Sequence, residues 1–126
     1  MKNFKLTLEF DGTDFFGWQK QPGLRTVQGV MEEVVRDVLG EPAKVTGCGR
    51  TDAGVHAWAY VCNFGADTGL EPEQLGPALS SRLPADLIIK RTEEVPVDFH
   101  SRFDATARRY EYRLATEKTA IYRRVT

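Results

Sequence analysis

The chain has 126 residues, of which 41% are hydrophobic and 28% are charged, and these proportions are usual for a globular domain. It contains no apolar run near the ~20 residues of a membrane-spanning helix, and its N-terminus lacks the apolar core of a signal peptide. These features favour one cytoplasmic domain with no membrane partner. The net charge of −1 argues against a domain that is basic throughout, as many nucleic-acid-binding domains are.

The charge is nevertheless uneven along the chain. Residues 99–126 contain seven Lys or Arg against three acids, a net charge of +4, and residues 1–98 contain ten against fifteen, a net charge of −5. A basic segment of this kind can bind phosphate or can be the solvated face of a strand. The two cysteines, Cys48 and Cys62, belong to no CxxC pair, so we expect reduced, partly buried thiols, no metal site and no cofactor.

The first elements are predicted by periodicity and by residues typical of helix ends. Apolar and polar residues alternate over residues 4–10, which predicts a half-buried strand, and Asp11 to Thr13 end it with a turn. A loop rich in aromatic residues and glycine follows over residues 15–23. Thr26 is a suitable N-cap for a helix whose apolar residues form one stripe until Gly40 ends it.

Two strands are expected next. Residues 44–48 predict a short strand and residues 55–64 a longer one. The longer strand is expected to be central because both of its faces are largely apolar. Unbroken alternation would place His56, Trp58, Tyr60, Cys62 and Phe64 together on one face.

The remaining elements complete a recognisable order. Residues 72–82 predict a second helix, a fourth strand begins at Leu87, and a last strand begins at Thr106. The order is βαββαβ plus an extra strand, which indicates an α+β fold: a ferredoxin-like antiparallel sheet with helices on one face. We take residues 1–126 as a single domain.

The segment from Gly49 to Ala57 contains the candidate for chemistry. It places Asp52 and Arg50 on a short loop bracketed by glycines, and such a loop can approach a ligand closely. An aspartate is ionised at neutral pH because its reference pKa is about 3.9. Asp52 could therefore act as a nucleophile without a helper base. It could also be an ordinary turn residue that bonds its own backbone, and the loop alone does not decide between these roles.

Four motifs along the chain resemble those of one enzyme family. They are Phe10-Asp11-Gly12-Thr13 with Gly17-Trp18-Gln19, Thr26-Val27-Gln28, Gly49 to Ala57, and Phe99-His100-Ser101-Arg102-Phe103 with Ala107-Arg108-Arg109-Tyr110. Together they make the chain similar to the N-terminal half of a TruA tRNA pseudouridine synthase.

The resemblance implies roles for individual residues. Asp52 matches the catalytic nucleophile, and Arg50 matches the arginine that fills the space left by the flipped base. Tyr110 matches the tyrosine that stacks on the target uracil, and Arg102 is expected to face phosphate. Each has a structural alternative: an ion pair for either arginine and a place in the core for Tyr110. His56 and His100 are expected to be structural or to contact RNA, and Trp18 to anchor its loop by packing.

The resemblance also implies the substrate and the partners. The family isomerises uridines at positions 38–40 of the tRNA anticodon stem-loop, and its members act as homodimers. They have two domains and are about twice as long, so we expect a C-terminal domain that is absent here, and little or no activity from these 126 residues alone. A non-catalytic RNA-binding module with the same sheet is the alternative function, and a structural or dimerisation domain is a third.

Overall fold

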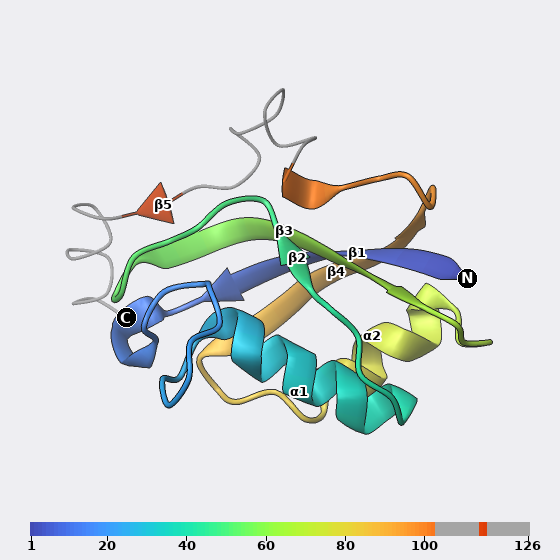
Figure 1. Ribbon diagram of the computed structural model, residues 1–126, viewed down its shortest axis with the longest axis horizontal. Coiled ribbons are helices and arrows are strands. Elements are labelled where there is room, and N and C mark those ends of the chain that lie inside the picture. The colour runs from blue at the N-terminus through green and yellow to red at the C-terminus, as the bar shows by residue number, and fades with distance from the viewer. Residues whose placement is uncertain (103–113, 116–126) are drawn as a thin grey trace.

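Helices α1 and α2 cover one face of an antiparallel sheet in the computed structural model (Figure 1). The structure describes residues 1–102 and 114–115. In chain order the elements are β1 (Lys2–Phe10), the 3-10 helix η1 (Gly12–Asp14), α1 (Val27–Leu39), β2 (Thr46–Gly47), β3 (His56–Ala66), α2 (Pro72–Ser80), β4 (Leu87–Val95) and β5 (Leu114–Ala115). This order confirms the predicted βαββαβ arrangement with an extra strand.

The central strands of the sheet are β1 and β3. The strand order is β2-β3-β1-β4, and every neighbouring pair is antiparallel. β5 also pairs with β3, at His56↔Ala115 and Ala57↔Leu114. Because β1 occupies one edge of β3, β2 and β5 share the other edge, β2 near the end of β3 and β5 at its beginning. The predicted strand from residue 106 otherwise lies outside the described residues.

α1 has the bounds that its sequence predicts. The hydroxyl oxygen of Thr26 accepts a hydrogen bond from the backbone N–H of Gly29 at 3.1 Å, which caps the helix. Gly40 ends it in the left-handed conformation, with a φ of +82°. α2 begins at Pro72 as predicted and ends at Ser80, two residues before the predicted limit.

The hydrophobic core lies between the sheet and the two helices. Alternate side chains of β1 point toward the helices, as the period-2 pattern predicts, and burying each large apolar side chain contributes about 1.5–3 kcal/mol relative to leaving it exposed. The buried residues that meet there include Phe4, Leu6, Leu8 and Phe10 of β1, Met31, Val34 and Val35 of α1, and Leu75 and Leu79 of α2.

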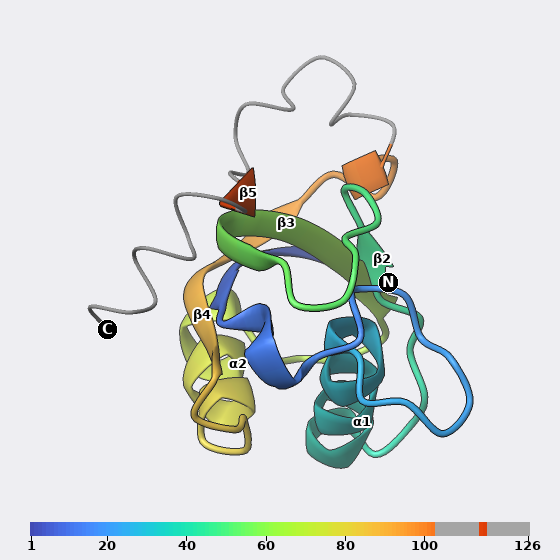
Figure 2. The ribbon, with the colours of Figure 1, turned by 90° about the vertical axis from the view of Figure 1, so that its left-hand side faces the viewer.

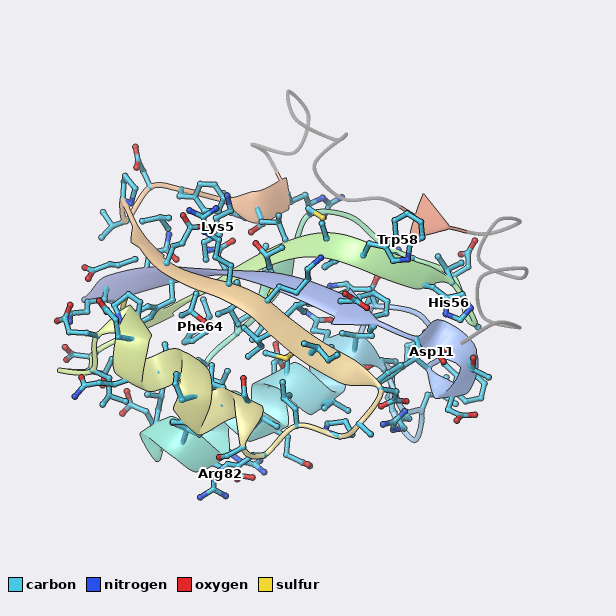
Figure 3. The ribbon with its side chains drawn as sticks, turned by 180° about the vertical axis from the view of Figure 1, so that it is seen from behind. Lys5, Asp11, His56, Trp58, Phe64 and Arg82 are labelled. Carbon is cyan, nitrogen blue, oxygen red and sulfur yellow. The ribbon has the colours of Figure 1, made fainter. Side chains whose placement is uncertain are left out.

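A β-bulge in β3 changes which side chains face the helices. Between Ala57 and Tyr60, β3 has one residue more than the facing stretch of β1. Ala57 therefore shares the core face with Tyr60, and Trp58 lies on the face away from the helices (Figure 3). The prediction that His56 and Trp58 share a face with Tyr60 is wrong, because it assumed an alternation that the extra residue interrupts.

The opposite face of the sheet is partly covered by the chain after β4. Residues 96–102, here called the 96–102 segment, cross that face, so the sheet lies between this segment and the helices (Figures 1 and 2). The described helices fall short of the length and apolar character that crossing a bilayer requires.

Candidate active site

Residues 48–55, here called the Asp52 loop, connect β2 to β3. Arg50 and Asp52 are exposed in this loop, whereas Thr51 between them is buried. Within the described part of the chain, neither Arg50 nor Asp52 forms an ion pair, and the Asp52 carboxylate bonds no backbone N–H. The turn is closed through the backbone, by a hydrogen bond from Val55 N to the Asp52 carbonyl at 3.2 Å. An ion pair between Arg50 and Asp52 and a turn-cap role for the carboxylate are thus both unsupported in this region.

Residues 15–23 after η1, here called the aromatic loop, hold the Asp52 loop through backbone hydrogen bonds. The N–H of Trp18 donates to the Thr51 carbonyl at 3.3 Å, and the N–H of Gly54 donates to the Phe15 carbonyl at 3.1 Å. Gly17 lies between these two contacts with a φ of +80°, and a Cβ there would overlap the Thr51 carbonyl oxygen. Only glycine allows both this conformation and this close approach.

The first turn of α1 holds the aromatic loop by two backbone hydrogen bonds. The N–H of Val27 donates to the Gly17 carbonyl at 3.2 Å, and the N–H of Gln28 donates to the Trp18 carbonyl at 2.9 Å. These amides are among those that a helix start leaves without intrahelical partners. The motif at residues 26–28 therefore acts on the Asp52 loop indirectly, through residues 17 and 18.

Tyr60 supports the beginning of the Asp52 loop, and sequence analysis did not identify this role. Its hydroxyl is hydrogen-bonded to the backbone of Gly49, and its fully buried ring lies 4.6 Å from that of Trp18, centroid to centroid. Trp18 is itself buried, which confirms the predicted packing anchor. The available signal was the phenol itself, because a tyrosine in a buried strand needs a hydrogen-bond partner for its hydroxyl.

His56 joins the end of the Asp52 loop to the turn after β1. Its Nδ1 accepts a hydrogen bond from the N–H of Gly12 at 2.8 Å and lies 3.1 Å from Oδ1 of Asp11 (Figure 3). A Cβ on Gly12 would overlap the Val55 carbonyl oxygen, so the two backbones touch. His56 is buried and has a structural role here, which is one of the two roles expected for it.

The other predicted site residues lie on the chain after β4. Arg102 is exposed at the end of the 96–102 segment, and this end lies beside the first part of the Asp52 loop in both views of the ribbon (Figures 1 and 2). Tyr110 lies outside the described residues. The structure thus brings the end of the 96–102 segment close to the start of the loop that bears Arg50 and Asp52.

The two cysteines, Cys48 and Cys62, are reduced and buried, as predicted. Burial raises the pKa of the Cys62 thiol well above its usual value, with a smaller contribution from Cys48. Among the described residues, no group of three or more His, Cys, Asp or Glu side chains could hold a metal ion.

The arrangement presents one carboxylate and one guanidinium on a backbone that is fixed on several sides. A carboxylate so placed can attack an electrophilic carbon, because it is accessible and no described cation neutralises it. These backbone contacts matter because a reacting group must be held close to its productive geometry. The guanidinium can stack on a base or bind a phosphate.

Comparison with known proteins identifies relatives along almost the whole chain. A family model described as tRNA pseudouridine synthase matches residues 7–104. The chain is similar to the tRNA pseudouridine synthase A of Clostridium acetobutylicum, with 47% identity over 129 aligned positions that cover 97% of this chain and 53% of the relative. The proteins of the same name from Solibacter usitatus and Brachyspira hyodysenteriae are each 48% identical, over 114 and 122 positions that cover 90% and 96% of this chain and 48% and 49% of the relatives.

The chain therefore spans about half the length of each of these relatives. The matched residues include the Asp52 loop, the aromatic loop and the start of α1, which are the segments that the contacts above hold together. This agrees with the resemblance drawn from the four motifs. The chain belongs to the tRNA pseudouridine synthase family.

Proposed function

We propose that the protein isomerises uridine to pseudouridine at positions 38–40 of the tRNA anticodon stem-loop, with Asp52 as the catalytic nucleophile. The N-glycosidic bond breaks at N1 of the uracil, the base rotates, and a bond forms from its C5 to the sugar. The proton on C5 is lost and N1 gains one, so the isomerisation is balanced without an oxidant or reductant. A carboxylate suits this chemistry because it can form or stabilise a covalent adduct with the sugar or the base.

The observation that supports this proposal most directly is the presentation of Asp52. Its carboxylate is exposed and forms no ion pair with a described residue, while the backbone on both sides of it is held by residues 15 and 18. An ordinary turn aspartate would direct its carboxylate to its own backbone. We infer that the fold keeps this group available for a ligand.

The remaining site residues act on the RNA. The target base must leave its stack before the carboxylate can reach it, and Arg50 occupies the space that the base leaves. Tyr110 stacks on the flipped uracil, a contact worth roughly 1–3 kcal/mol, and Arg102 binds a phosphate. We further propose that the full-length protein works in the cytoplasm as a homodimer, and sedimentation equilibrium of that protein tests the oligomeric state.

Replacement of the carboxylate tests the proposed function. In the full-length protein, Asp52→Asn keeps the shape of the side chain and removes its negative charge, so we expect near-complete loss of turnover. Binding of tRNA and the melting temperature should stay close to wild type, because the carboxylate has no described structural partner. Turnover is measured as tritium released from tRNA labelled at C5 of uridine.

Asp67→Asn is a matched control. Asp67 is also exposed, but it follows the far end of β3, and an eleven-residue strand separates the two ends by about 35 Å. This variant should retain full turnover. Unchanged turnover in Asp52→Asn would eliminate the nucleophile role, and a lowered melting temperature with reduced turnover would favour a structural role for the carboxylate.

A further inference from the structure

A buried polar network lies on the sheet face opposite the helices. Asn3 of β1 is 5% exposed, Asn63 of β3 is 8% exposed, and Ser101 of the 96–102 segment is 1% exposed. Asn63 pairs with Lys5, two residues from Asn3 along β1, so the two amides are diagonal neighbours on one face. Burying such groups is unfavourable unless their hydrogen bonds are made.

The hydrogen bonds of this network lead from the sheet to the 96–102 segment. The amide nitrogen of Asn63 donates to the amide oxygen of Asn3 at 3.1 Å. The amide nitrogen of Asn3 donates to the carbonyls of Pro96 and Phe99, both at 3.0 Å. The amide oxygen of Asn63 accepts from Ser101 twice, from its backbone N–H at 2.9 Å and from its hydroxyl at 2.6 Å. The segment is therefore fixed near its beginning and near its end.

Lys5 adds a third attachment on the same face. Its ammonium nitrogen lies 5.6 Å from the centroid of the Phe99 ring, a distance at which a cation is attracted to the ring face. Figure 3 shows Lys5 on the side of the sheet that points away from the helices. Apart from the bond between the two amides, these contacts are made to the 96–102 segment, so they order this connection on the sheet.

The last residue of this segment, directly after Ser101, is the exposed Arg102. We propose that Asn63 is a positioning residue for RNA binding: through Ser101 it holds Arg102 beside the Asp52 loop, where the guanidinium binds a phosphate of the RNA. This inference rests on the proposed function and adds to it a residue that does not touch the RNA. An arginine on an unordered segment would lose backbone and side-chain freedom on binding, and a segment fixed beforehand avoids most of that loss.

The test compares RNA binding by the full-length protein and its Ser101→Ala, Arg102→Ala and double variants. The ligand is a fluorescent anticodon stem-loop RNA, and its affinity is measured by anisotropy over a series of salt concentrations. Loss of one phosphate contact makes the negative slope of log K against log salt shallower by about 0.7–0.9. We expect this shallower slope in Arg102→Ala and also in Ser101→Ala, with a loss of affinity of about fivefold for the removed hydroxyl.

The double variant decides whether Ser101 acts through Arg102. If it does, adding Ser101→Ala to Arg102→Ala changes the affinity less than about twofold, because residues that share one interaction are not additive. The inference would be overturned if the losses of affinity in the two single variants multiplied in the double variant and the salt slope of Ser101→Ala were unchanged. The network would then only stabilise the fold.

Further variants make every outcome interpretable. Asn63→Ala should show the same loss of affinity and the same change of salt slope as Ser101→Ala. If Asn63→Ala does not fold, Ser101→Ala still tests the inference, because it retains the hydrogen bond from its backbone N–H to Asn63. Ser81→Ala is the control. Ser81, directly after α2, also donates through its hydroxyl, at 2.8 Å to the Ala78 carbonyl of α2, and this variant should bind RNA normally. If Arg102→Ala leaves affinity and salt slope unchanged while Asp52→Asn abolishes turnover, the inference fails and the proposed function stands.

Discussion

At Gly17 the aromatic loop lies too close to the Asp52 loop to leave room for a side chain. Gly17→Ala would have to adopt a φ near +80° and would place a methyl group on the Thr51 carbonyl oxygen. The left-handed conformation alone costs a non-glycine residue roughly 1–2 kcal/mol, and the overlap adds to that. We expect a loss of stability above that range, measured by urea denaturation, together with reduced turnover in the full-length protein.

Gly23 provides a matched comparison in the same loop. It also has a positive φ, +75°, but a Cβ there would have no atom within 4 Å. Gly23→Ala should therefore lose only the conformational contribution, roughly 1–2 kcal/mol, and keep normal turnover. Equal losses of stability in the two variants would show that the contact between Gly17 and Thr51 yields easily and does not fix the loop.

At the scale of an element, the first turn of α1 has two roles: it begins the helix and it supports the candidate site. Thr26→Ala removes the hydroxyl that caps Gly29, and loss of such a cap typically costs about 1 kcal/mol. We expect that decrease in the free energy of unfolding, whereas Thr26→Ser, which keeps the hydroxyl, should stay within a few tenths of wild type. A loss as large in Thr26→Ser would point to packing of the threonine methyl group in place of the cap.

The elements differ in how well the sequence predicts them. α1 is predicted to its first and last residue because the Thr26 cap, the apolar stripe and Gly40 are all local signals. The faces of β3 are not, because its bulge depends on pairing with β1 and leaves no mark in a pattern of apolar residues. The number of strands follows from local alternation, whereas the register follows from partners that are distant in sequence.

The same division holds for the site. Motif spacing identifies Asp52 and Arg50, and the structure places both, exposed, on the predicted loop. Motif spacing does not predict the hydrogen bond of Tyr60 to Gly49. Nor does it predict the Asn3–Asn63 amide pair, whose members are 60 residues apart in the chain. Such contacts depend on how the strands align and have no local signature. The prediction for Tyr110 remains untested by the described residues.

At the scale of the whole molecule, the two thiols report different kinds of opening. Cys62 is fully buried in the central strand β3, and burial raises the pKa of its thiol, so little reactive thiolate is present near pH 8. Cys48 lies at the start of the Asp52 loop, attached to β3 by a hydrogen bond from its N–H to the Val61 carbonyl at 2.9 Å. We expect Cys48 to react with iodoacetamide faster than Cys62.

Mass spectrometry of labelled peptides over a series of low urea concentrations measures both rates. The rate for Cys62 should rise steeply with urea because it requires exposure of most of the core, and the rate for Cys48 should rise only weakly because it requires local opening. Identical rates with identical urea dependence would mean that the Asp52 loop opens only when the entire fold does.

The bulge in β3 also determines how the loop before it is oriented. If the same residues of β3 alternated regularly, without a bulge, the phase upstream of Tyr60 would be reversed, with His56 turned against the helices and Ala57 turned outward. His56 could then no longer accept from Gly12, and the turn after β1 would lose its link to the loop. The bulge therefore helps to determine the direction in which the loop leaves the sheet, because it keeps Ala57 toward the helices and leaves His56 in reach of the turn after β1.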